Sequence, residues 1–344
     1  MNSSILLIYT GGTIGMKQDP ETGALMPFNF NEILREVPEL KKFGCKIDTF
    51  SFEPPIDSSD IHTDFWVEIA KLIKKNYKSY DGFVILHGTD TMSYSASALS
   101  FMLENLEKPV IFTGSQLPIG MLRTDGKENL ISSIEIAAAK DSNGRAIVPE
   151  VCIYFENRLY RGNRTTKYNA EDFRAFRSAN YPVLAEIGVH IKYNTSYIRY
   201  PQTWDNELSI KTNLGTSVAI LKIFPGMSRE MVEPILNIKG LKALILETYG
   251  SGNAPTAEWF INLLKNAIAN GLIILNITQC HAGKVDMDAY STGILLKKIG
   301  VIGGFDSTTE AAITKLFFIL GYTNDTQEIK SMLKNNMRGE ISNY

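Results

Sequence analysis

Short runs of apolar, mostly β-branched residues alternate with longer stretches of helical period in the first part of the chain. Such alternation is typical of βαβ units around a buried parallel sheet. Helices are predicted at residues 65–74, where the apolar residues share one face, and at residues 94–103. The predicted strands are residues 5–9, 82–86, 110–112 and 151–155. This part of the chain is therefore predicted to be a doubly wound, mostly parallel α/β domain.

A polar, irregular stretch around residues 192–213 interrupts this pattern, and the alternation then resumes. Such a stretch is typical of a linker between compact units. We expect a larger N-terminal domain at residues 1–190, a linker at 191–215 and a smaller C-terminal α/β domain at 216–344. In the last of these, strands are predicted at 218–224, 243–247 and 272–277, helices at 230–236 and 258–269, and a helical tail at 308–333.

The charge balance favours a small substrate over a polymer. Hydrophobic residues make up 44% of the 344 residues, as in ordinary globular proteins. The 35 basic and 37 acidic residues give a net charge of -2, which provides no field that would attract nucleic acid or a membrane surface. Residues 5–10 form an apolar run that is too short for a membrane span and lacks the basic flank of a signal peptide. We expect a cytoplasmic protein.

The cysteines and histidines show no pattern of a metal or disulfide site. The cysteines are odd in number and far apart, and the histidines lack H-E-x-x-H spacing. We therefore expect no metal, no other cofactor and a reducing compartment. These residues are Cys45, Cys152, Cys280, His62, His87, His190 and His281.

Glycines and hydroxyl residues follow three of the predicted strands, as Thr10-Gly-Gly-Thr13, His87-Gly-Thr-Asp90 and Thr113-Gly-Ser115. Ligands of open parallel sheets bind outside the carboxyl ends of the strands, and glycine allows close approach of the backbone. Each loop alone is equally typical of a turn in which threonine caps a helix. The three together favour a ligand site. No dinucleotide or phosphate-binding glycine motif is present.

A threonine hydroxyl becomes a useful nucleophile only when a neighbouring group removes its proton. His87 is one candidate for that base, although its position at a strand end also suits a packed histidine with satisfied hydrogen bonds. Lys167, in the loop Arg161-Gly-Asn-Arg-Thr-Thr-Lys167, is the better candidate, because burial beside a threonine favours an uncharged amine. On composition alone this basic loop is typical of a solvated surface.

Over nearly its whole length, the chain resembles the bacterial cytoplasmic (type I) L-asparaginases. The segments that carry the resemblance are Tyr9-Thr-Gly-Gly-Thr-Ile-Gly-Met16, Asp57-Ser-Ser-Asp60, Gly82-Phe-Val-Ile-Leu-His-Gly-Thr-Asp-Thr-Met92, Leu159-Tyr-Arg-Gly-Asn-Arg-Thr-Thr-Lys167, Tyr249-Gly-Ser-Gly-Asn-Ala-Pro255 and Val301-Ile-Gly-Gly304. The T-G-G-T-I and H-G-T-D-T-M pair in this order is highly specific. The resemblance implies hydrolysis of L-asparagine to aspartate and ammonia by a homodimer or homotetramer.

The resemblance also implies roles for individual residues. Thr13 is the expected nucleophile that forms an acyl-enzyme, and Thr89, Asp90 and Lys167 form a second catalytic group that relays protons. Backbone N–H groups near Thr89 are expected to hold the acyl oxyanion. The expected substrate-binding residues are Asp57, Ser58 and Ser59, together with Thr89 and Asp90, where Ser58 holds the α-carboxylate and Asp90 the α-ammonium group.

Two features depart from the resemblance. Exported relatives carry a tyrosine on the flexible loop after the nucleophile, but the loop Thr22-Gly-Ala-Leu-Met-Pro27 has none, and Leu25 and Met26 stand there instead. The base that deprotonates Thr13 is therefore open. Some type I enzymes are activated by asparagine at a second site, where an arginine is expected but Glu247 stands here, so allosteric activation is only a hypothesis. The other matching positions of that site are Thr166, Asn253, Thr278 and Cys280.

Three alternatives remain. Selectivity between asparagine and glutamine is open, because one methylene changes the binding free energy by only about 1–3 kcal/mol. The related amidotransferase subunit that supplies ammonia for tRNA modification is disfavoured, since no basic stripe is evident. A catalytically silent amino-acid sensor would not require Thr13, Thr89, Asp90 and Lys167 together.

Overall fold

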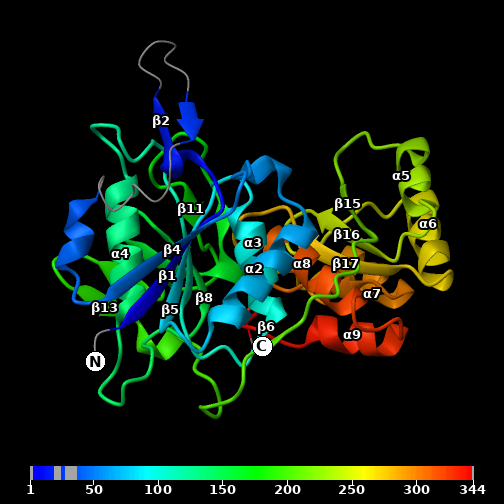
Figure 1. Cartoon of the computed structure of the whole chain (residues 1–344). Helices are drawn as coiled ribbons and strands as arrows, with labels where there is room; N and C mark the ends of the chain where they lie inside the picture. Colours follow the sequence, from blue (N-terminus) through cyan, green and yellow to red (C-terminus); the bar gives the residue numbers. More distant parts are fainter. Residues whose placement is uncertain (1–2, 19–24, 28–36, 343–344) are drawn as a thin grey trace. The chain divides into compact units, whose positions relative to one another are not determined.

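The computed structural model describes residues 3–18, 25–27 and 37–342. Contacts between residues divide the chain into two compact units, the first ending at Thr212 and the second beginning at Asn213. Each unit contains its own parallel sheet and its own helices (Figure 1). The predicted α/β fold class is therefore confirmed. Among the described helices, none has the length and apolarity that a membrane crossing needs.

The sheet of the first unit has the strand order β13-β12-β9-β8-β7-β5-β1-β4. Its strands from β8 to β4 are parallel, so the carboxyl ends of neighbouring strands meet at one edge of the sheet. All four strands predicted in this part of the chain form. The parallel strands are β1 (Ser4–Tyr9), β4 (Lys46–Ser51), β5 (Gly82–Leu86), β7 (Val110–Thr113) and β8 (Val151–Phe155).

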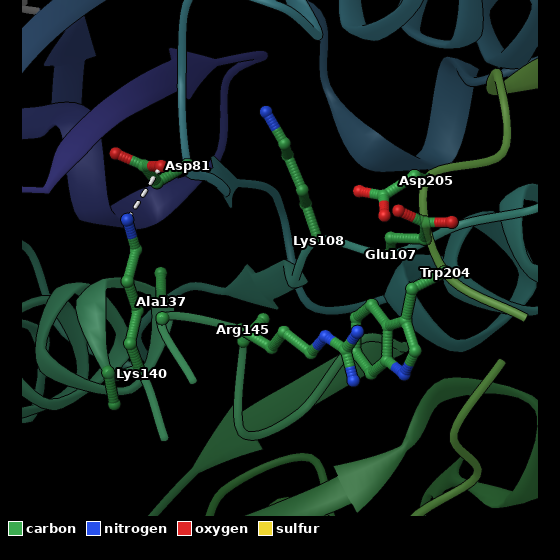
Figure 2. Close-up of a pocket in the computed structure, with 11 residues that line it drawn as sticks. Asp81, Glu107, Lys108, Ala137, Lys140, Arg145, Trp204 and Asp205 are labelled. Carbon is green, nitrogen blue, oxygen red and sulfur yellow. Dashed lines mark hydrogen bonds and ion pairs between the residues drawn. The ribbon is translucent and has the colours of Figure 1, made fainter. Parts of the chain in front are cut away.

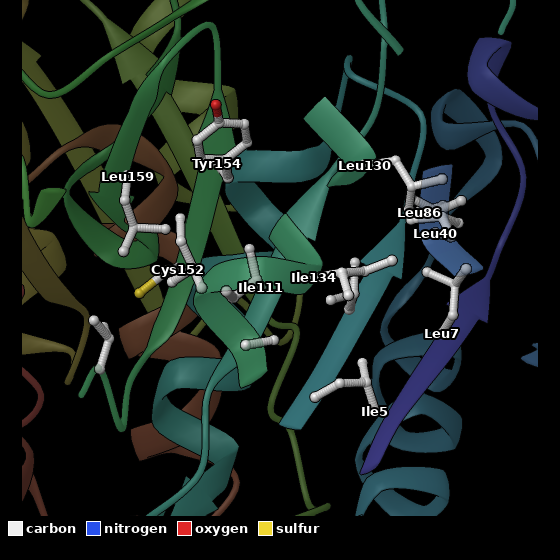
Figure 3. Close-up of a cluster of buried hydrophobic side chains, with 14 of the residues drawn as sticks. Ile5, Leu7, Leu40, Leu86, Ile111, Leu130, Ile134, Cys152, Tyr154 and Leu159 are labelled. Atoms are coloured by element: carbon white, nitrogen blue, oxygen red, sulfur yellow. The ribbon is translucent and has the colours of Figure 1, made fainter. Parts of the chain in front are cut away.

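Helices cover both faces of this sheet, with α4 on one face and α2 and α3 on the other (Figure 1). The helices are α2 (Thr63–Asn76), α3 (Met92–Met102) and α4 (Gly126–Ala138). Alternate residues of each strand point to opposite faces. In Figure 3, side chains from β1, β5 and β7 pack against those of α4, which gives this face a dry core. The labelled residues of this group are Ile5, Leu7, Leu86, Ile111, Leu130 and Ile134.

Antiparallel strands extend the sheet beyond β8, namely β9 (Arg158–Arg161), β12 (Ala185–Ile187) and β13 (Ile191–Tyr193). The segment for which we expected a linker, residues 191–215, thus begins with a strand of this sheet. Part of it, β14 (Ser209–Ile210), pairs with β6 (Leu103–Glu104). Two further hairpins pair β2 (Met16–Gln18) with β3 (Leu25–Pro27) and β10 (Thr166–Lys167) with β11 (Phe176–Arg177).

The second unit has a parallel sheet in the order β15-β16-β17-β18, and α5, α6 and α7 pack on the same apolar cluster against it. Its strands are β15 (Val218–Lys222), β16 (Ala243–Thr248), β17 (Ile273–Thr278) and β18 (Ile302–Gly303). Its helices are α5 (Arg229–Leu236), α6 (Glu258–Ala269), α7 (Ser291–Ile299), α8 (Thr309–Leu320) and α9 (Thr326–Lys334). The predicted helical tail is thus two helices, because Asp325 accepts hydrogen bonds from Gln327 and Glu328 and caps α9.

A buried ion pair ties the end of the described chain to α8. Lys315 Nζ lies 2.6 Å from Glu340 Oε1, and the two side chains are 4% and 0% exposed. The ammonium also donates to the carbonyls of Leu333 and Asn335, and the carboxylate accepts from the backbone of Met337 and Arg338. Each charge therefore has several partners, as a buried charge requires.

Removing one member of this pair is expected to destabilise the fold strongly. In a Lys315→Met variant, Glu340 would be a buried carboxylate without its counter-charge, and we expect the free energy of unfolding to fall by about 3–5 kcal/mol. Urea denaturation followed by circular dichroism measures the change. The matched control is Lys297→Met, which breaks an exposed pair with Asp288 that has a similar distance of 2.7 Å. Equal losses in the two variants would contradict the expectation, because exposed pairs contribute little.

The same pair predicts a direction for acid denaturation. Burial raises the pKa of Glu340, but the Lys315 ammonium and the backbone N–H groups outweigh burial, so the pKa lies below its ordinary value. A carboxyl group with a lowered pKa in the folded state contributes stability above the pKa of the unfolded chain, and this contribution is lost as the pH falls through the folded value.

Candidate active site

The turn after β1 carries Thr13 at the carboxyl edge of the first sheet. The N–H and the hydroxyl of Thr10 both donate to the carbonyl of Leu86, each at 3.0 Å, which fixes the start of the turn beside β5. Gly12 has a φ of +91°, which L-residues with a side chain rarely adopt. Thr13 then begins the short helix η1 (Thr13–Gly15) and is partly exposed. The threonine hydroxyl is therefore presented on a tight, glycine-dependent turn.

The loops after β1, β4 and β5 are in direct contact. The N–H of Ile56 donates to the carbonyl of Thr10 at 2.8 Å. A Cβ placed on Gly12 would lie 2.6 Å from the Cα of Gly88, and one on Gly88 would lie 2.5 Å from the Oγ of Ser58. These distances are shorter than any van der Waals contact, so glycine is required at both positions. The strand-end loops therefore converge, as the sequence predicts.

Replacing Gly12 by alanine is expected to damage this convergence. The methyl group would collide with the backbone of Gly88, and the residue would also have to hold a φ of +91°. We expect a loss of about 2–3 kcal/mol in stability and at least about a 100-fold loss in turnover. The matched control is Gly44→Ala, since nothing lies within 4 Å of a Cβ at Gly44. Thermal unfolding and the turnover rate check the pair, and a Gly12→Ala variant that behaves like its control would contradict the expectation.

Lys167 joins the two polar residues of the loop after β5. Its ammonium donates to Thr89 Oγ1 at 2.8 Å and to Asp90 Oδ1 at 2.6 Å. The lysine side chain is 18% exposed and the Asp90 side chain 64% exposed. Asp90 thus keeps an open side that faces solvent. The sequence-based expectation of Thr89, Asp90 and Lys167 as one group is consistent with this geometry.

Helix α3 supports both parts of this group, through serines that the sequence analysis did not single out. It follows the loop that holds Thr89, and its Ser100 accepts a hydrogen bond from Asn163 at 3.0 Å. Gly162 allows the loop before Lys167 to lie against Ala96. The signal in the sequence was the set of hydroxyls inside an otherwise apolar helix, MSYSASALSFM. Buried hydroxyls need partners, so they mark places where a helix holds a loop.

A buried ion pair anchors the start of the Lys167 loop. Arg161 Nε lies 2.6 Å from Glu150 Oε2, and the side chains are 5% and 8% exposed. The hydroxyl of Thr165 donates back to the carbonyl of Arg161 at 2.7 Å. The loop is therefore not the solvated basic surface that composition alone would suggest.

Asp57, Ser58 and Ser59 form a short turn in contact with Gly88. The carboxylate of Asp57 accepts hydrogen bonds from the backbone and the hydroxyl of Ser59, both at 2.8 Å, and these bonds lower the pKa of Asp57. Ser58 is buried, and its carbonyl accepts the hydroxyl of Thr91 at 2.6 Å. This turn therefore offers polar groups beside the Thr89 loop.

Neither His87 nor Tyr9 is suited to deprotonate a threonine. His87 is buried, both of its ring nitrogens are hydrogen-bonded, and burial lowers its pKa to about 4. Tyr9 lies so close to Gly15 that a Cβ there would be 2.2 Å from the phenol oxygen. Burial raises the pKa of Tyr9 to about 12, so the phenol stays protonated at neutral pH. In the loop that was expected to act as a lid, residues 22–24 lie outside the described residues, and Leu25–Pro27 forms β3.

The expected effector residues have partners of their own. Glu247 accepts a hydrogen bond from Thr309 at 2.8 Å, and Lys222 lies 3.5 Å from its carboxylate. Thr278 donates to the carbonyl of Gly250 at 2.6 Å and accepts from the N–H of Cys280 at 3.0 Å. The side-chain oxygen of Asn253 accepts from Thr292 at 2.6 Å. Thr166 belongs to the first unit, in β10.

A pocket of about 160 Å³ lies at the opposite, amino-terminal edge of the first sheet (Figure 2). Its charged groups already bind one another or the backbone: Lys140 pairs with Asp81 at 2.9 Å, and Lys108 donates to the carbonyls of Tyr77 and Tyr80. Arg145 lies over the ring of Trp204. The pocket therefore offers no unmatched group for a ligand. No cluster of three or more His, Cys, Asp or Glu suited to a metal occurs among residues 3–18, 25–27 and 37–342.

Comparison with known proteins finds similarity over the whole chain. Residues 4–199 match the family described as asparaginase, N-terminal, and residues 217–333 match the glutaminase/asparaginase C-terminal domain. L-asparaginase 1 from Escherichia coli K12 is 44% identical over 341 residues, which cover 98% of each chain. The structure of L-asparaginase I from Vibrio cholerae superimposes with a TM-score of 0.89 at 40% identity and covers 99% of this chain and 100% of its own. A glutamyl-tRNA(Gln) amidotransferase protein from Pyrococcus furiosus is 35% identical over 343 residues, 99% of this chain and 77% of that protein.

Proposed function

The chain belongs to the asparaginase family, and we propose that it hydrolyses the side-chain amide of L-asparagine to L-aspartate and ammonia. The observation that carries the proposal within the molecule is the Lys167 ammonium, which joins Thr89 and Asp90 in a loop that contacts the Thr13 turn. A nucleophilic hydroxyl, a proton-transferring amine and a carboxylate are the groups that amide hydrolysis requires.

In the proposed reaction, Thr13 Oγ attacks the side-chain carbonyl carbon of asparagine and loses its proton. The carbon–nitrogen bond breaks, the nitrogen takes up a proton and leaves as ammonia, and an aspartyl ester of Thr13 remains. Water then attacks the ester, which releases aspartate and restores the hydroxyl. Thr89, Asp90 and Lys167 relay protons in these steps, because the three groups already share hydrogen bonds.

The proposed substrate site matches a zwitterion. Asp90 has a largely exposed carboxylate that can pair with the α-ammonium group, since Lys167 binds one of its oxygens and the side chain is otherwise open to solvent. Ser58, beside Gly88, is proposed to hold the α-carboxylate, and Asp57 and Ser59 complete the turn around it. A substrate with both charges needs partners of both signs, and this edge of the sheet supplies them.

Ammonia release from asparagine and from glutamine, measured in parallel over a range of concentrations, tests the proposed function. We expect turnover of both amides to be detectable and kcat/KM to be higher for asparagine. The longer glutamine chain differs by one methylene, so discrimination by about 10- to 200-fold is the range that pocket contacts can supply. Absence of ammonia release from asparagine would overturn the proposal, and a higher kcat/KM for glutamine would reassign the substrate.

We also propose that the chain acts as a homodimer or homotetramer in the cytoplasm. Support for this comes from the similarity to L-asparaginase 1 over nearly the whole chain. Allosteric activation by asparagine stays a prediction. Glu247 gives a negative charge where an effector carboxylate would bind, and a hyperbolic dependence of rate on asparagine concentration would contradict activation.

A further inference from the structure

The buried His87 lies directly beneath the Thr89 loop and is part of no step in the proposed reaction. Its side chain is 1% exposed, and its ring packs edge-on against Phe112. Nδ1 lies 2.6 Å from the carbonyl oxygen of Gly88, and Nε2 lies 2.9 Å from the Oγ of Ser95. A short polar contact thus connects α3 to the first peptide group of the loop.

The partners of the ring determine which nitrogen carries the proton. The carbonyl of Gly88 can only accept, so Nδ1 must be the donor. The indole of Trp66 can only donate, and it lies 2.9 Å from Ser95 Oγ, which leaves the serine proton for Nε2. Burial lowers the pKa of His87 to about 4, so the ring is neutral near pH 7. The hydrogen bonds therefore run in one direction, from Trp66 through Ser95 and His87 to Gly88.

The last bond in this series fixes the orientation of the peptide between Gly88 and Thr89. A trans peptide is planar, so a carbonyl held toward His87 directs the Thr89 N–H to the opposite side. The peptide has little room for any other arrangement, since Gly12 and Ser58 crowd Gly88. A hydrogen bond to the carbonyl also polarises the peptide, which strengthens its N–H as a donor.

We propose that His87 is a positioning residue, which directs the Thr89 N–H toward the oxyanion that forms when Thr13 attacks the substrate carbonyl. This inference rests on the proposed asparagine hydrolysis. An N–H that is preorganised toward a developing negative charge lowers the barrier, because it binds the transition state more strongly than the ground state. His87 itself touches neither the substrate nor the reacting atoms and acts through the Gly88 carbonyl.

Two amide substitutions separate the two hydrogen bonds of the ring. In His87→Asn, the side-chain N–H₂ reaches the place of Nδ1 and keeps the bond to Gly88. In His87→Gln, it reaches the place of Nε2, near Ser95, and the bond to Gly88 is lost. We expect His87→Asn to keep kcat within about 3-fold of the wild type. We expect His87→Gln to lose about 30-fold in kcat with KM for asparagine within about 2-fold, since the affected donor acts in the transition state.

The outcomes distinguish positioning from simple packing. Each variant loses one buried hydrogen bond, so thermal unfolding is expected to fall by similar amounts in both. If the wild type hydrolyses asparagine but kcat falls equally in both variants, or in neither, the inference is overturned and the proposed function stands. If the wild type releases no ammonia, the proposed function fails, and the inference fails with it.

A measurement on the wild type is independent of whether the variants fold. Nitrogen-15 NMR of histidine-labelled protein reports which ring nitrogen of each histidine carries the proton. We expect the His87 ring to carry it on Nδ1 at pH 7. A proton on Nε2 would overturn the inference, because no donor would then face the Gly88 carbonyl.

Discussion

A Thr13→Ala variant is expected to release ammonia from asparagine at least about 10⁴-fold more slowly than the wild type. Removal of a nucleophile leaves only the catalysis that comes from binding and oxyanion stabilisation. Thr13 is partly exposed on a turn that the backbone of Thr10 and Gly12 holds in place, so the truncation should leave the fold intact. Coupled detection of ammonia measures the rate, and calorimetric titration with asparagine measures the remaining binding.

The matched control is Thr13→Ser, which keeps a hydroxyl at the same position. We expect this variant to lose no more than about 10-fold in kcat, because the nucleophilic atom is retained. Binding of asparagine with about the wild-type affinity by Thr13→Ala would show that the substrate site survives. Ammonia release by Thr13→Ala at the wild-type rate would contradict the nucleophile, and a wild type that binds asparagine without releasing ammonia would identify a sensor.

A Lys167→Met variant is expected to lose about 10³-fold in kcat. Methionine has a similar length, but it removes the donor that binds Thr89 and Asp90 at 2.8 and 2.6 Å. Transfer of a proton by a positioned side chain typically contributes about 10²- to 10⁴-fold. Steady-state kinetics with asparagine measure the loss.

Lys167→Arg separates proton transfer from charge. Arginine keeps the positive charge beside Asp90, but it does not give up its proton in proteins. We therefore expect Lys167→Arg to stay at least about 100-fold below the wild type in kcat. Activity close to that of the wild type would show that only the charge of Lys167 is needed.

The convergence of the strand-end loops could be predicted from the sequence because it depends on local signals. Apolar runs identified strands that are parallel neighbours, and glycines followed each of them. Parallel strands bring such loops to one edge whatever the rest of the chain does. The contact of Lys167 with Thr89 spans a distance along the chain that no periodicity encodes, and only the family resemblance suggested it.

Other features could not be predicted because they depend on tertiary contacts. Helix α4 has buried serines on an otherwise apolar face, so its residues show no clear helical period. Strand β4 is an edge strand of the sheet with half-exposed residues, and its composition resembles a loop. The role of Ser95 appears only when Trp66 and His87 are seen on either side of its hydroxyl. Long-range partners, which propensity does not contain, decide each of these cases.

The covalent intermediate tests the central claim most directly. The wild-type enzyme is mixed with asparagine, quenched in acid within milliseconds, digested and mapped by mass spectrometry. The account predicts an aspartyl ester on the peptide that contains Thr13, and specifically on its hydroxyl. An aspartyl ester on Thr89 or on any other side chain would contradict it.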